Sequence, residues 1–350
     1  MAENSKIEWC DHTFNPWMGC TKVSPACQNC YAERDMDHRY GKVVWGPRGT
    51  RVKTSADNWR KPLKWNRYEA KYLHLVQDNL DGTADGGEAV ARRPKVFCAS
   101  LADVFEDWQG PILDHHGHKG FCRDFEGQRN YYWHSQPVDE EVTRNAGLRP
   151  ITMDDLRADL FRLIDATPYL DWLLLTKRPE NVRRMWPDYE LCRWDSTGRE
   201  LPLRHLRHNV WLGTSIENQE WADKRIPELL KCRDLSPVLF VSAEPILEPI
   251  DLDRSWKVFR ADGHRLNRNQ YAAECPTHGI DWVITGGESG PDARPCNPAW
   301  FRSLRDQCAA AKVPFFFKQW GEWDENQARV GKKAAGRLLD GRTYDDFPRY

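Results

Sequence analysis

Three cysteines gather near the start of the chain, inside the segment 19–33. Cys20, Cys27 and Cys30 form a C-x6-C-x2-C pattern, and Pro25 between them is typical of a loop. Their neighbours are mostly polar, unlike the apolar surroundings of cysteines that only fill a core. Thiolates are preferred ligands of zinc and of iron–sulfur clusters. The array therefore predicts a metal site, and the choice between zinc and an iron–sulfur cluster is open at this point.

The composition is that of a globular protein. The 350 residues carry a net charge of −1, with 40% hydrophobic and 29% charged residues. No apolar run approaches the ~20 residues of a membrane span, and the N-terminus lacks a signal-peptide core. We therefore expect a cytoplasmic protein without membrane contact. In that setting the 11 cysteines favour thiols and metal binding over disulfides.

Short apolar runs rich in β-formers alternate with helical patterns over most of the chain. The expected strands are Lys95–Ser100, Asp171–Thr176, Val210–Ser215, Val238–Ser242, Trp282–Thr285 and Pro314–Phe317. The expected helices include Met153–Ala166, with Thr152 as N-cap, Gln219–Cys232 and Pro298–Ala311. This alternation predicts parallel βαβ units in an α/β fold, a partial or complete (β/α) TIM-like barrel. We expect one domain over 1–350, with insertions at about 77–93, 108–149, 188–207 and 254–280.

Polar side chains follow the expected strands in succession. They are Ser100, Asp103, Lys177, Ser215, Glu217, Glu244, Glu288 and Lys318. Single residues of this kind also cap helices, but their recurrence at the same phase favours a shared active face, because parallel strands of a barrel open onto one end. The four acidic members also leave open a metal-dependent nuclease that binds Mg²⁺ or Mn²⁺.

Three other segments invite a functional interpretation. Residues 56–76 interleave aromatic and basic side chains, which suits a phosphate backbone but is more often a solvated helix face. The tracts Asp114–His118 and Cys275–His278 have zinc-ligand residue types. Neither offers four ligands at regular spacing, so we expect no metal at either tract.

Several motifs together resemble the phage-associated three-Cys-motif family. They are Ile7-Glu8-Trp9, Asn15-Pro16-Trp17, the array 19–33, Leu175–Pro179, Leu212–Asn218, Ser242–Pro245, Gly286–Ser289, Phe317–Gly321 and Leu339–Arg342. The resemblance covers nearly the whole chain. Members of that family are largely uncharacterised, and the resemblance implies a phage setting and leaves room for a phage- or operon-encoded partner protein.

The layout also resembles the radical S-adenosylmethionine (radical SAM) superfamily. That resemblance implies a [4Fe-4S] cluster on Cys20, Cys27 and Cys30, with S-adenosylmethionine completing the open iron. The residues it implies around the cofactor are the eight at the strand ends, with Lys177 for the cofactor carboxylate and Glu217 or Glu244 for its ribose hydroxyls or ammonium. The implied reaction is reductive cleavage of the sulfonium to a 5′-deoxyadenosyl radical. No residue that acts directly on a substrate is assigned.

The expected function is therefore a radical-SAM-like iron–sulfur enzyme that modifies or repairs a nucleotide or nucleic acid. The alternative is a zinc-stabilised nucleic-acid-binding protein of phage defence or recombination. In that alternative, Cys10 or His12 would be the fourth ligand of a closed tetrahedral site.

Overall fold

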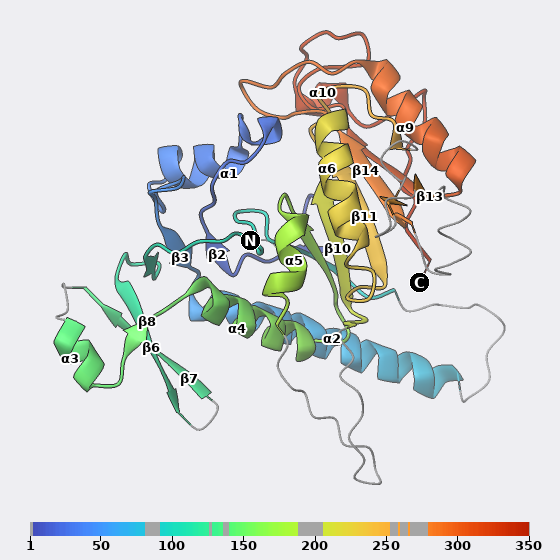
Figure 1. Ribbon diagram of the computed structural model, residues 1–350. Helices are drawn as coiled ribbons and strands as arrows, with labels where there is room; N and C mark the ends of the chain where they lie inside the picture. Colours follow the sequence, from blue (N-terminus) through green and yellow to red (C-terminus); the bar gives the residue numbers. More distant parts are fainter. Residues whose placement is uncertain are drawn as a thin grey trace. The chain divides into compact units, whose positions relative to one another are not determined.

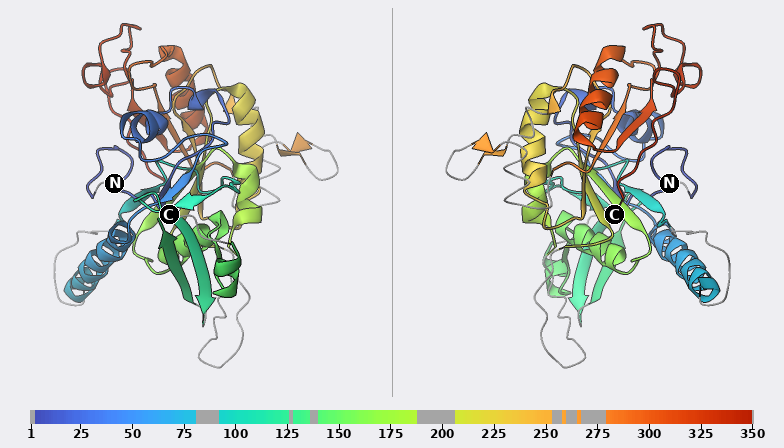
Figure 2. Two further views of the ribbon diagram at one scale, coloured as in Figure 1. Left: turned by 90° about the vertical axis from the view of Figure 1, so that its left-hand side faces the viewer. Right: turned by 90° about the vertical axis from the view of Figure 1, so that its right-hand side faces the viewer.

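The computed structural model describes most of the chain (Figure 1 and Figure 2). The described residues are 3–80, 92–125, 128–135, 140–187, 206–252, 258–259, 265–266 and 279–349. Most of the expected insertions 77–93, 188–207 and 254–280, and all of Cys275–His278, lie outside them. The chain divides into two compact units, one of residues 1–22 and 31–172 and the other of residues 23–30 and 173–350.

The main sheet is a curled, parallel half-barrel of seven strands. Its order is β1 (His12–Thr13), β4 (Lys95–Cys98), β9 (Asp171–Thr176), β10 (Val210–Ser215), β11 (Val238–Ala243), β14 (Trp282–Gly286) and β15 (Phe315–Gln319). The six strands expected from the sequence are all present, within one or two residues of their expected bounds. The prediction of a parallel α/β sheet is confirmed, and β1 is an addition to it.

In the second unit, helices cover one face of the sheet. Its described helices are η1 (Pro25–Cys27), α5 (Pro179–Met185), α6 (Gln219–Leu230), α9 (Pro298–Ala311) and α10 (Lys332–Ala335). Strand β12 (Val258–Phe259) pairs antiparallel with β13 (Arg265–Leu266). Helix α6 packs against β10 and β11, and α9 packs against β14 and β15 (Figure 1). Phe301 of α9 meets Phe317 with ring centroids 5.1 Å apart. Phe317 therefore marks the helix-covered face of β15.

The first unit holds a second, smaller sheet that the sequence pattern does not predict. Its strands are β2 (Trp17–Met18), β3 (Arg51–Lys53), β5 (Ile112–Leu113), β6 (Lys119–Phe125) and β7 (Gln128–His134), and β8 (Arg149–Pro150) pairs with β6. Its helices are α1 (Tyr31–Glu33), the π-helix η2 (Arg34–Arg39), α2 (Ala56–Leu80), α3 (Glu140–Asn145) and α4 (Met153–Asp165). Four of its strands have only two or three residues, too few to show an alternating pattern.

Helix α4 begins where the sequence predicts. The Thr152 hydroxyl accepts a hydrogen bond from the Asp155 backbone N–H, and the Asp155 carboxylate accepts one from the Thr152 N–H, which completes a capping box. Leu156, Leu160 and Ile164 lie one helical turn apart and are fully buried. The cap satisfies the first backbone donors of the helix, and the apolar stripe attaches the helix to the core of its unit.

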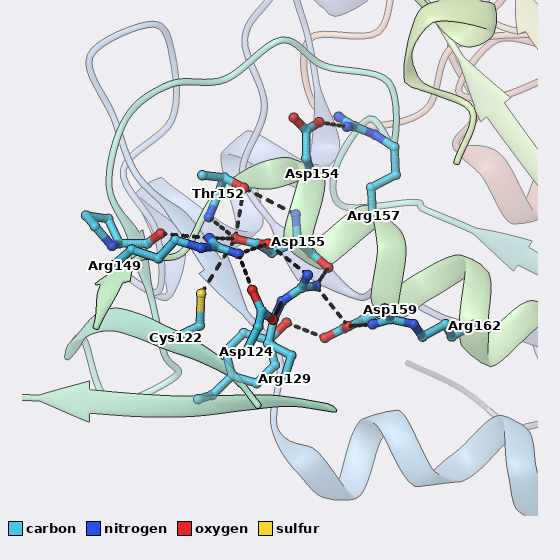
Figure 3. A network of polar contacts seen from close by, with 12 residues as sticks. Cys122, Asp124, Arg129, Arg149, Thr152, Asp154, Asp155, Arg157, Asp159 and Arg162 are labelled. Carbon is cyan, nitrogen blue, oxygen red and sulfur yellow. Dashed lines mark hydrogen bonds and ion pairs between the residues drawn. The ribbon is translucent and has the colours of Figure 1, made fainter. Parts of the chain in front are cut away.

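An ion-pair network connects the smaller sheet of the first unit to α4 (Figure 3). Arg149 of β8 donates to both oxygens of Asp155, at 2.6 and 2.8 Å, and Arg129 of β7 lies 3.2 Å from the same carboxylate. Burial alone would raise the pKa of Asp155. The hydrogen bonds from Arg149 and Thr152 outweigh burial and hold that pKa at about 2. Asp155 is thus a charged anchor at the helix N-terminus.

We expect Asp155→Asn to lower the free energy of unfolding by about 2 kcal/mol at pH 7, the value of a pKa held nearly two units down. Because the folded pKa lies below the ordinary value of 3.8, this stability is present above pH ~4 and is lost as the pH falls toward ~2. Urea unfolding of both proteins at pH 7 and at pH ~3 measures the difference, which should shrink at the lower pH.

The matched control is Asp57→Asn, which removes an exposed partner of Arg60 and should change the stability by less than ~1 kcal/mol. A difference between wild type and Asp155→Asn that stays constant between the two pH values would contradict the assignment.

Candidate functional site

In the second unit, alternate residues of neighbouring strands lie on one face of the sheet. Strands β10 and β11 are in parallel register with Ser215 opposite Ser242, and β14 continues the row with Ile284. Side chains two residues apart on a strand share a face. Ser215, Ser242 and Glu244 therefore lie on the same side of the sheet, which is the side opposite Phe317.

The lower part of this face is aromatic. The Trp282 ring lies 6.0 Å from Trp211, 5.7 Å from Phe240 and 5.9 Å from Phe316, measured between centroids. Gly213 leaves room for this layer, since a Cβ at that position would come within 2.4 Å of the Phe240 ring. The rings form an apolar floor below the strand ends.

Two pairs of polar side chains lie at the ends of the strands, beyond the aromatic rings. Lys177 Nζ lies 3.2 Å from Ser215 Oγ, and Lys318 forms an ion pair with Glu244. The side chains of Lys318 and Glu244 are 13% and 18% exposed, so they can be reached from solvent without being fully hydrated. A cation beside a hydroxyl and a mixed cation–anion pair, both at strand ends of one sheet, offer charges of both signs to a zwitterionic ligand.

A second strand-end carboxylate, Glu217, is fully buried. Arg225 of α6 lies 2.9 Å from its Oε2, and the two side chains are 2% and 0% exposed. The Arg225 guanidinium also donates to the Ser215 carbonyl at 3.0 Å. Glu217 Oε1 accepts a hydrogen bond from the Ala26 N–H at 3.3 Å. This carboxylate therefore joins α6, the end of β10 and the cysteine loop.

Glu288 makes a similar connection after β14. Arg294 donates to both of its oxygens, and Asn29 Nδ2 donates to Oε2 at 3.1 Å. Burial opposes ionisation of Glu288, but the Arg294 and Asn29 hydrogen bonds lower its pKa overall. Arg294 also donates to the Pro25 carbonyl at 3.1 Å.

These contacts fix the position of Cys27 and Cys30 in the second unit. Segment 23–30 is attached to Glu217 through Ala26, and to Glu288 through Asn29 and Arg294. Cys27 ends the short helix η1, with its Sγ 3.9 Å from Ser24 Oγ. Two of the three predicted ligand cysteines thus lie on a loop held at the ends of β10 and β14.

The remaining predicted residues belong to the first unit. Cys20 follows Gly19, whose N–H donates to the Leu101 carbonyl at 3.0 Å, and Gly19 bridges to Ala102. Ser100 Oγ accepts from Asn15 Nδ2 at 3.0 Å. Asp103 is buried and accepts from the Phe105 N–H at 3.0 Å. Ser100 and Asp103 therefore flank the segment against which the backbone before Cys20 lies.

Cys20, Cys27 and Cys30 carry half-buried thiols on one loop, and none of them is in a disulfide. Thiols of this kind are ligands both of zinc and of iron–sulfur clusters. At the strand ends, the buried Gln319 Oε1 has no hydrogen-bond partner among the described residues, as a ligand-binding acceptor would. Within the same residues, no group of three or more His, Cys, Asp or Glu side chains is arranged to hold a metal ion.

The carboxylates of the nuclease interpretation are engaged with cations or backbone. Glu217 pairs with Arg225, Glu244 with Lys318, and Glu288 with Arg294. In the tract Asp114–His118, the Asp114 carboxylate accepts hydrogen bonds from the backbone N–H groups of His116 and His118, both at 2.8 Å, and so stabilises a turn. His12 stacks on Trp65 at 4.3 Å and accepts from the Asn4 N–H, which gives it a packing role in the first unit.

Sequence reasoning missed Arg225, Arg294, Asn29 and Gln319. Arg225 lies in the middle of an ordinary amphipathic helix, and Arg294 and Asn29 lie in loops. Nothing in their spacing distinguishes them from solvated polar residues. Gln319 is the last residue of β15 and stands beside the predicted Lys318. Its place just after the expected strand Pro314–Phe317 was an available signal.

A family model described as a protein of unknown function (DUF5131) matches residues 4–111 and 149–348. No curated protein and no solved structure matches the chain. The unmatched stretch between the two parts contains β5, β6, β7 and α3. Among the described helices, none has the length and apolar character needed to cross a membrane.

Proposed function

This chain belongs to the DUF5131 family of proteins of unknown function, and we propose that it is an iron–sulfur enzyme of the radical SAM type that acts on a nucleotide or nucleic acid. In this proposal the half-barrel is the partial (β/α) barrel of that superfamily. The site lies where the strands end.

The proposal is supported most by the attachment of the cysteine loop. Segment 23–30, with two of the three cysteines, is held by Glu217 and Glu288 at the ends of β10 and β14. Lys177 and Ser215, and Glu244 and Lys318, end strands of the same sheet. A thiol loop and a set of opposite charges are thus combined at the end of a parallel sheet where enzymes of this architecture act.

Each group has a task in the proposed site. Cys20, Cys27 and Cys30 would hold a [4Fe-4S] cluster, and Lys177 would bind the carboxylate of S-adenosylmethionine. Glu244 would bind its ammonium or ribose hydroxyls. Each oxygen of Glu217 already accepts a hydrogen bond from the protein, one from Arg225 and one from Ala26, so its task is to position the loop. When bound, the two cofactors supply reductive cleavage of a sulfonium, and the aromatic floor below excludes water from it.

The test is metal and product analysis of anaerobically purified protein. We expect about four irons and a similar amount of acid-labile sulfide per chain, as for one [4Fe-4S] cluster. With dithionite as reductant and S-adenosylmethionine present, 5′-deoxyadenosine should accumulate. One zinc and no iron after anaerobic reconstitution would overturn the proposal in favour of the zinc-stabilised alternative.

A further inference from the structure

Helix α2 in the first unit has two contrasting faces over the part whose side chains are described, Ala56–Tyr68. Asn58, Pro62 and Trp65 are buried. The outward side carries Arg60, Lys61, Lys64 and Arg67, all exposed. We call these four residues the basic face of α2.

The basic face carries a net positive charge. Over Ala56–Tyr68 there are four basic residues and one acidic residue, Asp57, whereas the whole chain has a net charge of −1. Asp57 pairs with Arg60 at 2.6 Å. For Lys61 and Lys64, no carboxylate partner is found in the part of the chain that the structure describes. Arg67 donates to the Leu63 carbonyl of its own helix at 3.4 Å.

Exposed apolar groups lie among these charges. Tyr68 is 60% exposed, and Lys64 Nζ lies 5.8 Å from the centroid of its ring. Leu63 is 36% exposed. Arg60, Lys64 and Arg67 have no acidic residue at i±4 with which an ordinary surface helix would pair them.

We propose that the basic face of α2 binds the phosphate backbone of a nucleic acid. At ~1.5 Å per residue, Arg60 and Arg67 are about 10 Å apart along the helix axis, roughly three phosphate steps of a strand at 3.4 Å each. Tyr68 offers a ring on which a base can stack. The inference deepens the proposed function, because it names the surface that holds a nucleic-acid substrate.

Fluorescence anisotropy with labelled single-stranded and double-stranded DNA of mixed sequence tests the proposal. The apo protein is used, so that neither cluster nor cofactor enters the measurement. The variant is R60Q/K61Q/K64Q/R67Q, since Gln preserves helix propensity. The control R144Q/R184Q/K224Q/K231Q removes four exposed basic residues, three from other helices and Lys231 just after α6, and changes the net charge equally.

We expect the variant to bind at least ~10-fold more weakly at ~0.1 M salt. The slope of log K against log[salt] should fall by about 3 for the duplex, because each lost phosphate contact removes ~0.9 and Arg60 is shared with Asp57. The control should bind like wild type, and thermal midpoints should match in all three proteins.

Equal weakening in variant and control would overturn the proposal, since only net charge would then matter. Absence of binding by the wild type to both DNAs would also overturn it. Neither result bears on the proposed reaction, which is tested separately by iron content and by formation of 5′-deoxyadenosine. Binding by the wild type without any iron uptake would sink the proposed function and leave the DNA surface standing.

Discussion

Replacing Cys20, Cys27 or Cys30 with serine is expected to lower iron incorporation during anaerobic reconstitution at least ~10-fold in each single variant. Each thiolate would be one of only three protein ligands, and a serine hydroxyl is a far poorer ligand for iron in such a cluster. Formation of 5′-deoxyadenosine should be lost with the iron. Iron and sulfide assays, together with the broad absorption near ~400 nm typical of such clusters, measure the effect.

The matched control is Cys10→Ala. Cys10 is buried in the first unit and is the residue that a closed zinc site would recruit as its fourth ligand. We expect the control to bind iron like wild type, because an iron left open for an external ligand needs no fourth protein thiolate. If Cys10→Ala removes the metal together with the three array variants, the site has four protein ligands and the proposed open iron is wrong.

The strands of the second unit could be predicted because their signal is local. Val210–Ser215 and Val238–Ala243 are short runs of buried apolar residues ending in serine or alanine, and each is found where the pattern places it. The Thr152 cap was predictable for the same reason, since a capping box involves residues only three apart. Elements defined by near neighbours can be read from sequence.

Long-range partners could not be predicted in this way. Asn29 and Glu288 are 259 residues apart, and Ala26 and Glu217 are 191 apart. The recurrence of polar residues just after each expected strand singles out Glu217 and Glu288 as candidate site residues, but it does not predict which residues they contact. The sequence interpretation therefore offered Glu217 as a cofactor-binding residue, whereas the structure gives both of its oxygens to protein donors.

Glu217→Gln distinguishes these two roles. If Glu217 is a buried structural anion, the substitution leaves the Arg225 guanidinium uncompensated between α6 and β10. Removing one partner of a buried pair costs about 3–5 kcal/mol in the free energy of unfolding. Gln keeps the shape of the side chain and a carbonyl acceptor for the Ala26 N–H. The decrease in the free energy of unfolding therefore measures the effect of removing the negative charge. Urea unfolding at pH 7 measures it.

The control for this substitution lies on the same helix. Glu220 and Lys224 form an i,i+4 pair whose side chains are 63% and 56% exposed, and Glu220→Gln should cost less than ~1 kcal/mol because water screens that pair. A cofactor-binding role for Glu217 requires the opposite pattern, a small change in stability with a weaker affinity for S-adenosylmethionine. Equal stability of the two variants would therefore remove Glu217 as the residue that positions the cysteine loop, and would return it to the set of cofactor ligands.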